Sequence, residues 1–109
     1  MNGSEKQVKW AEGIKAAKED RFATLAAVAK LPAAIKAIEY IHNNQSASFW
    51  IDYRLETVDQ MLRLLLTGDL HICGTTHDVT AQIDHKTGII TEQWPVERNG
   101  KIVKEAKTL

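Results

Sequence analysis

The segment LHICGTTHD, residues 70–78, holds the side chains best suited to chemistry in this chain. It contains the only cysteine, Cys73, and two of the four histidines, His71 and His77. Imidazole and thiolate are ligands that Zn²⁺ prefers, and a nearby carboxylate or histidine would complete a tetrahedral set. However, zinc sites usually pair their ligands at short intervals such as C-x-x-C, whereas here one cysteine stands between two histidines. We therefore predict no metal site and no cofactor.

A catalytic thiol is the second chemistry that this segment suggests. It needs a nearby base and a lowered pKa, which His71 or His77 would supply only if the fold brings one alongside. If residues 71–73 form a strand, His71 and Cys73 share a face, as in any alternating strand. The chain also lacks G-x-G-x-x-G, P-loop, G-x-S-x-G and H-E-x-x-H motifs. We therefore predict no catalytic residue and a protein that is not an enzyme.

The aromatic segment from Phe49 to Arg54, FWIDYR, is a better candidate for contact with a partner. Trp, Tyr and Arg are the residues that most often dominate binding hot spots. We predict a partner-binding set made of Trp50, Asp52, Tyr53 and Arg54. The structural alternative places Phe49 and Trp50 in the core, with Asp52 and Arg54 at its rim.

The residues before the segment at 70–78 carry the sequence signals of helices. Ser4 and Gln7 fit a capping box, which predicts a helix from near Glu5 to about Lys30. Leu31-Pro32 interrupts it, since proline disfavours helical geometry in the preceding residue and suits the first turn of a new helix. The two helices then form one kinked rod or fold back as a hairpin. The expected apolar stripe of the first helix consists of Trp10, Ile14, Ala17, Leu25 and Val28.

Two shorter helices and two hairpins complete the expected order. The aromatic segment reads as a short helix, and a capping box at Thr57 starts a helix that ends at Gly68. Residues 79–83 and 89–94 read as strands, and Asn99-Gly100 marks a further tight turn. The chain is thus predicted to be one α+β domain, residues 1–109. Three to four helices occupy residues 1–69, and a small antiparallel β-meander occupies residues 70–109.

Composition narrows the classes of partner. The 109 residues carry a formal net charge of zero, and the helical and strand halves balance separately. Nucleic acid bound mainly through its phosphates is therefore disfavoured, although a local basic patch remains an alternative. No apolar run approaches the roughly 20 residues that cross a bilayer, and no signal-peptide core follows the first residues. With a single cysteine, these features predict a cytoplasmic protein without membrane contact.

Two boxes, GSEKQVKWAEGI at residues 3–14 and FWIDYR at residues 49–54, carry a resemblance. The chain resembles small uncharacterised proteins of bacteriophages and prophages that share a G-[ST]-x-K-Q-x-x-W-A-x-x-I helix start and a W-I-D-x-R box. The matching positions cover about half of the chain. The resemblance implies a phage or mobile-element setting and supplies no catalytic residues.

The leading functional expectation is an accessory protein that binds and inhibits a bacterial host factor by steric occlusion. Its most concrete form is anti-defence or anti-CRISPR activity, with a host defence protein as the partner. The alternative is a homo-oligomer that sequesters a nucleotide-like signal, formed when apolar helix faces pair across a symmetry axis. A nucleic-acid-binding accessory protein is a further alternative.

Overall fold

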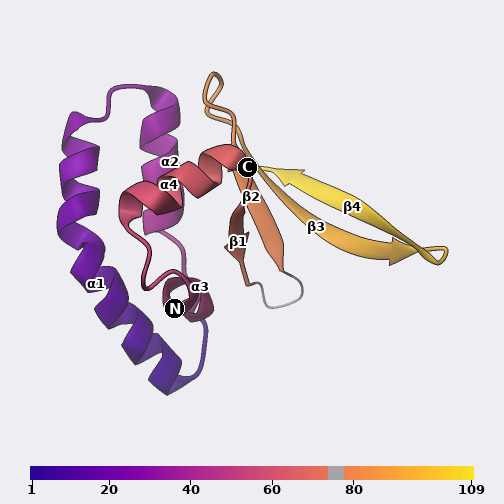
Figure 1. The fold of residues 1–109 in the computed structure, drawn as a ribbon, viewed down its shortest axis with the longest axis horizontal. Helices are drawn as coiled ribbons and strands as arrows, with labels where there is room; N and C mark the ends of the chain where they lie inside the picture. Colours follow the sequence, from indigo (N-terminus) through magenta and orange to yellow (C-terminus); the bar gives the residue numbers. More distant parts are fainter. Residues whose placement is uncertain (74–77) are drawn as a thin grey trace.

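The computed structural model describes residues 1–73 and 78–109. Four helices precede a four-stranded antiparallel sheet whose strands lie in chain order, β1-β2-β3-β4. Figure 1 shows the helices gathered on one side, with β3 and β4 extending away from them. The predicted α+β arrangement, with helices first and a β-meander after, is confirmed.

Helix α1, Glu5–Val28, begins at the predicted capping box. The Oγ of Ser4 accepts from the N–H of Gln7, and the Gln7 side chain accepts from the N–H of Ser4. The predicted apolar stripe is confirmed in part, because Ile14 and Leu25 pack against the core, whereas Trp10 and Val28 are exposed. The buried residues of the helix are Ala11 and Phe22. Eleven residues make about three helical turns, so Ala11 and Phe22 share a face, and Trp10 lies about 100° away from it.

Helix α2, Pro32–His42, folds back beside α1 (Figure 1). Leu31 is extended, with ψ of 135°, and Pro32 occupies the first turn of the helix. The hairpin alternative is therefore the one that forms. Ala37, Ile38 and Ile41 face the core, and His42 at the end of α2 contacts Glu19 of α1 at 2.9 Å.

Helices α3, Ala47–Asp52, and α4, Val58–Thr67, are joined by an exposed link. The link ends at Thr57, which caps α4 in the predicted capping box with Gln60. Gly68 ends α4 with φ of 82°, a left-handed conformation that glycine adopts without steric cost. The capping signals thus locate both ends of α4 correctly.

Replacing Thr57 with alanine is expected to lower the free energy of unfolding by about 1 kcal/mol. The substitution removes the oxygen that accepts from the N–H of Gln60 at 3.1 Å. Urea denaturation followed by circular dichroism measures the loss. Thr57→Ser keeps the hydroxyl and is the matched control, so an equal loss in both variants would contradict the capping explanation.

Strands β1, Leu70–Ile72, β2, Val79–Ile83, β3, Ile90–Arg98, and β4, Lys101–Thr108, form the meander. α4 packs against β1 and β2. The core side chains of these two strands alternate with exposed ones. The sheet supplies Leu70, Ile72, Ala81, Ile83 and Ile90 to the hydrophobic core.

The end predicted for the third strand, at Trp94, is wrong, because β3 continues through Pro95 to Arg98. Pro95 lies opposite Lys104, while pairing with β2 ends at Gln93. Pro95 therefore lacks its N–H at a position where no strand of the described residues would accept a hydrogen bond. The predicted Asn99-Gly100 turn is confirmed, with φ of 52° and 74° at the two residues.

One hydrophobic cluster links all four helices to β1, β2 and β3. Its largest fully buried side chains are Trp50, Phe49, Ile41, Met61, Leu65, Leu70 and Val58. Within residues 1–73 and 78–109, no helix combines the length and the apolar character needed to cross a membrane.

Candidate functional site

Trp50, one of the four residues of the predicted partner-binding set, lies in the core with 0% of its surface exposed. Phe22 of α1 and Phe49 of α3 contact it edge-on, with ring centroids at 6.1 Å and 5.2 Å. Its indole N–H donates to the carbonyl of Asn44 at 3.0 Å. These contacts hold the α1 and α3 layers together, so the indole is not available at the surface.

The remaining residues of the aromatic segment divide between core and surface. Tyr53 is half-buried, and its hydroxyl accepts the backbone N–H of His71 at 2.8 Å, which joins α3 to β1. Burial raises the pKa of Tyr53, so the phenol stays protonated. Asp52 and Arg54 are exposed, and the Arg54 guanidinium lies 5.5 Å from the ring centroid of Trp10. Partner binding by Asp52, Tyr53 and Arg54 stays a prediction.

Cys73 follows β1 and faces carboxylates. Its Sγ lies 3.5 Å from Oδ2 of Asp52, and Nε2 of His71 lies 3.7 Å from Oδ2 of Asp78. Partial burial raises the pKa of the thiol, and the charges of Asp52 and Asp78 raise it further. This is opposite to the lowered pKa that a nucleophilic cysteine requires.

His77, one of the side chains considered as a metal ligand, lies outside the described residues. Among residues 1–73 and 78–109, no three His, Cys, Asp or Glu side chains gather closely enough to hold a metal ion.

Cys73 is expected to react slowly with iodoacetamide at neutral pH, with a rate that rises only in the alkaline range. A raised pKa leaves little thiolate at pH 7, and thiolate is the reactive form. Asp52→Asn removes a charge that opposes thiolate formation and should therefore increase the rate at pH 7. Alkylation rates followed by mass spectrometry across pH test this. A rate for Asp52→Asn equal to or below that of the parent would contradict the assignment.

An apolar groove of about 370 Å³ lies where the end of α1, the start of α2 and one face of α4 meet. Alanines of α2 and its link to α1, together with Ile83 and His85, complete the lining. Val28 and Leu31 are 67% and 68% exposed, although each has a branched apolar side chain. The large apolar residues of the apolar groove are Leu25, Val28, Leu31, Ile38, Leu62, Leu66 and Ile83.

The apolar groove was not predicted, because Val28 was assigned to the apolar stripe of the first helix. The available signal was the width of the apolar stripe on α4. Leu65 faces the core and is fully buried, whereas the next residue, Leu66, is half exposed and lines the groove. A stripe wider than one packing face predicts a second contact surface.

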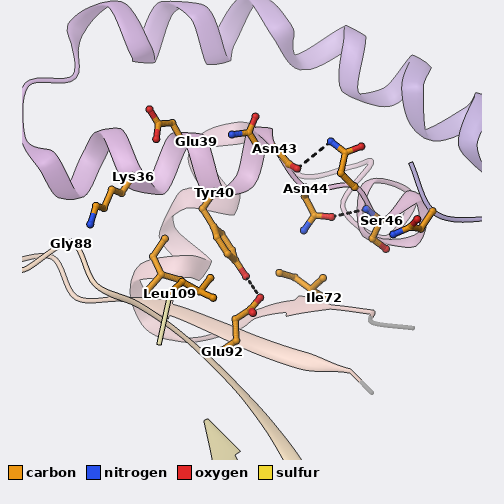
Figure 2. A pocket seen from close by; sticks show the side chains of 13 residues that line it. Lys36, Glu39, Tyr40, Asn43, Asn44, Ser46, Ile72, Gly88, Glu92 and Leu109 are labelled. Atoms are coloured by element: carbon orange, nitrogen blue, oxygen red, sulfur yellow. Dashed lines mark hydrogen bonds between the residues drawn. The ribbon is translucent and has the colours of Figure 1, made fainter. Parts of the chain in front are cut away.

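A second, polar pocket of about 510 Å³ lies between α2 and the sheet (Figure 2). Figure 2 shows Tyr40 reaching from α2 to Glu92 of β3, with its hydroxyl donating to Oε2 at 2.6 Å. Burial and the adjacent carboxylate raise the pKa of Tyr40. The charged side chains that line this pocket are Lys36, Glu39 and Glu92. Two carboxylates to one ammonium make it a poor receptor for phosphate groups.

Comparison with known proteins supplies no residue roles. Neither a family model, nor a curated protein, nor a solved structure matches this chain. The candidate site therefore rests on geometry, and the apolar groove is proposed because apolar side chains make up all of its lining except His85.

Proposed function

We propose that this protein is a non-enzymatic accessory protein that binds a bacterial host protein through the apolar groove and blocks it sterically. The exposure of Val28 and Leu31 beside Leu66 is the observation that supports this proposal most directly. Contiguous exposed apolar surface is the usual mark of a protein–protein contact. A groove between helices suits the apolar face of an amphipathic partner helix.

The charges beside the apolar groove favour a partner with acidic flanks. Lys30 lies between two groove residues, Lys86 follows His85, and both lysines are exposed. Asp84 also adjoins the groove and stays ionised, because the backbone N–H groups of Lys86 and Thr87 lower the pKa of its carboxyl, so two cations face one anion there. The partner segment in this proposal is therefore an amphipathic helix with acidic residues beside its apolar face.

The phage or mobile-element setting rests on the resemblance of the two sequence boxes. In that setting the protein acts in the bacterial cytoplasm, and inhibition of a defence protein, including a CRISPR effector, is the specific form of the proposal. Steric inhibition needs no catalytic group, which agrees with a protonated Cys73 thiol flanked by carboxylates.

Leu31→Glu is expected to abolish partner binding while leaving the fold intact. The Leu31 side chain is mostly exposed. Leu31 is also the N-cap of α2 without a capping hydrogen bond from its side chain, so the substitution removes no such bond. Tagged parent and variant proteins would capture partners from host lysate, and the complex would then be rebuilt from purified components for calorimetry. Efficiency of plating on a CRISPR-immune host tests the anti-CRISPR form separately.

The matched control is Leu55→Glu, which places the same change at a leucine that is 85% exposed and outside the groove. The proposal predicts that Leu55→Glu binds the purified partner as the parent does. If Leu31→Glu binds with parental affinity, the apolar groove is not the docking surface. If the parent protein captures and inhibits no host protein, the functional proposal itself fails.

The nucleotide-binding alternative has less support in the polar pocket. Glu39 and Glu92 outnumber Lys36 there, and a nucleotide would bring further negative charge. We expect a panel of nucleotides to leave the midpoint of thermal unfolding unchanged. A concentration-dependent rise in that midpoint would favour the alternative over inhibition of a host protein.

A further inference from the structure

The hairpin of β3 and β4 projects beyond the rest of the sheet (Figure 1). Pairing with β2 ends at Gln93, so within residues 1–73 and 78–109 the stretch from Pro95 to Arg98 pairs in the sheet with β4 alone. β4 is the last strand in the sheet order, and its outer edge faces no other strand of the described residues. We call residues 94–105 the arm.

The alternation of hydrogen bonds between β3 and β4 shows which backbone groups of the arm point outward. The N–H of Leu109 donates to the carbonyl of Ile90 at 2.8 Å, one position beyond the Thr91 and Thr108 pair. Antiparallel pairs alternate between hydrogen-bonded and non-hydrogen-bonded positions, so the odd-numbered residues of β4 bond to β3. The N–H and C=O groups that point to the open edge are those of Ile102, Lys104, Ala106 and Thr108.

The two edges of the arm differ in the backbone N–H groups that they offer to an additional strand. On the β3 edge, the alternation points the nitrogen of Pro95 outward, and proline has no N–H to offer. On the β4 edge, each outward residue keeps its N–H, and Ile102 is 79% exposed. One edge of the arm is thus closed to pairing, and the other is open.

The geometry points to a second copy of this chain as the occupant of the open edge. We propose that two arms pair antiparallel about a two-fold axis at Val103, which joins the two four-stranded sheets into one. Ile102 then faces Lys104 of the second copy, and each such pair exchanges both of its N–H to C=O hydrogen bonds. This interface is separate from the apolar groove and does not depend on the proposed function.

Charge complementarity favours this alignment over its neighbour at Lys104. With the axis at Val103, Lys101 lies opposite Glu105 of the second copy, and the symmetry repeats the pair. Glu105 already forms an ion pair with Arg98 of its own chain, and a carboxylate can accept from two cations through its two oxygens. Moving the axis by one residue to Lys104 would instead place that lysine opposite its own copy, a repulsive arrangement.

An alignment centred on Ala106 would also pair opposite charges, Glu105 with Lys107. It would leave Ile102 unpaired and bring Leu109, which lines the polar pocket beside the helices, toward the second copy. The axis at Val103 lies within the projecting part of the hairpin, away from the helices, and covers Ile102 and Val103. The apolar residues of the arm therefore favour the alignment at Val103.

Sedimentation velocity over a range of protein concentrations tests the proposal, with circular dichroism to verify the fold of each variant. The parent should show a reversible monomer–dimer equilibrium. Ile102→Pro should remove the dimer, because it deletes an outward N–H and no bond to β3, whereas Ile102→Thr keeps that N–H and should retain pairing. Hydrogen exchange should show the N–H groups of Ile102 and Lys104 protected in the parent.

Charge reversal tests the alignment. Lys101→Glu should raise the dimer dissociation constant roughly tenfold, since it creates two like-charge contacts. The double variant with Lys101→Glu and Glu105→Lys should recover pairing, and Lys107→Glu should leave the constant unchanged. A parent that stays monomeric at every concentration would overturn the proposal. So would a dimer that survives Ile102→Pro, or one that only Leu31→Glu or Lys107→Glu disrupts.

Discussion

Trp50→Ala is expected to lower the free energy of unfolding by about 3–5 kcal/mol, the largest loss among the predicted variants. The indole is fully buried between Phe22 and Phe49, so its removal leaves a cavity that rings from two helices cannot readily fill. The carbonyl of Asn44 also loses the indole N–H. Because domains of this size are usually stable by about 5–15 kcal/mol, the variant should be close to unfolding at physiological temperature.

Urea denaturation followed by circular dichroism measures the effect of Trp50→Ala, with the slope of the transition used to check that unfolding stays two-state. Leu55→Ala is the control, since Leu55 is almost fully exposed and its truncation should change stability by no more than about 0.5 kcal/mol. A well-folded Trp50→Ala variant with near-parental stability would contradict the core position of the indole. It would also restore Trp50 as a candidate for partner contact.

Leu65→Ala should cost about 2–5 kcal/mol, the second largest expected loss. Leu65 is fully buried in α4, the helix that packs against β1 and β2, so the truncation opens a cavity between the helical layer and the sheet. Alanine is also a strong helix former, and the loss therefore reports packing rather than a weakened helix.

The neighbouring residue supplies a matched control for this packing effect. Leu66→Ala makes the same chemical change one position later in the same helix, where the side chain is half exposed in the apolar groove. We expect a loss of about 1 kcal/mol or less, because less apolar surface leaves the core. Equal losses for Leu65→Ala and Leu66→Ala in urea denaturation would mean that the two faces of α4 are misassigned.

Local signals in the sequence predicted most of the fold. Capping boxes at Ser4 and Thr57, the proline at the start of α2, and the Asn99-Gly100 turn each act through backbone geometry within a few residues. These signals fix where a helix or turn begins or ends, independently of which elements pack against it. The end of β3 was missed because the effect of Pro95 depends on how far β2 extends, which is a tertiary fact.

The candidate site was harder to predict from residue types. A tryptophan is equally suited to a core and to a binding surface, and only the packing of Phe22 from α1 places Trp50 inside. The stripe of α1 was predicted only in part for the same reason, since packing against α2, α3 and α4 decides which of several apolar faces is buried. The apolar groove arises where the link between α1 and α2 meets α4, which is distant in sequence, so no short motif encodes it.

The three tryptophans lie in three different parts of the molecule, which gives this chain its own set of optical reporters. Trp10 is half exposed on α1 beside Arg54, and Trp50 is fully buried in the core. Trp94 is half-buried at the first residue of the arm. Their emission maxima should differ, with Trp50 the bluest. Variants that keep one tryptophan, with the others changed to phenylalanine, would separate a signal from the helical surface from one at the arm.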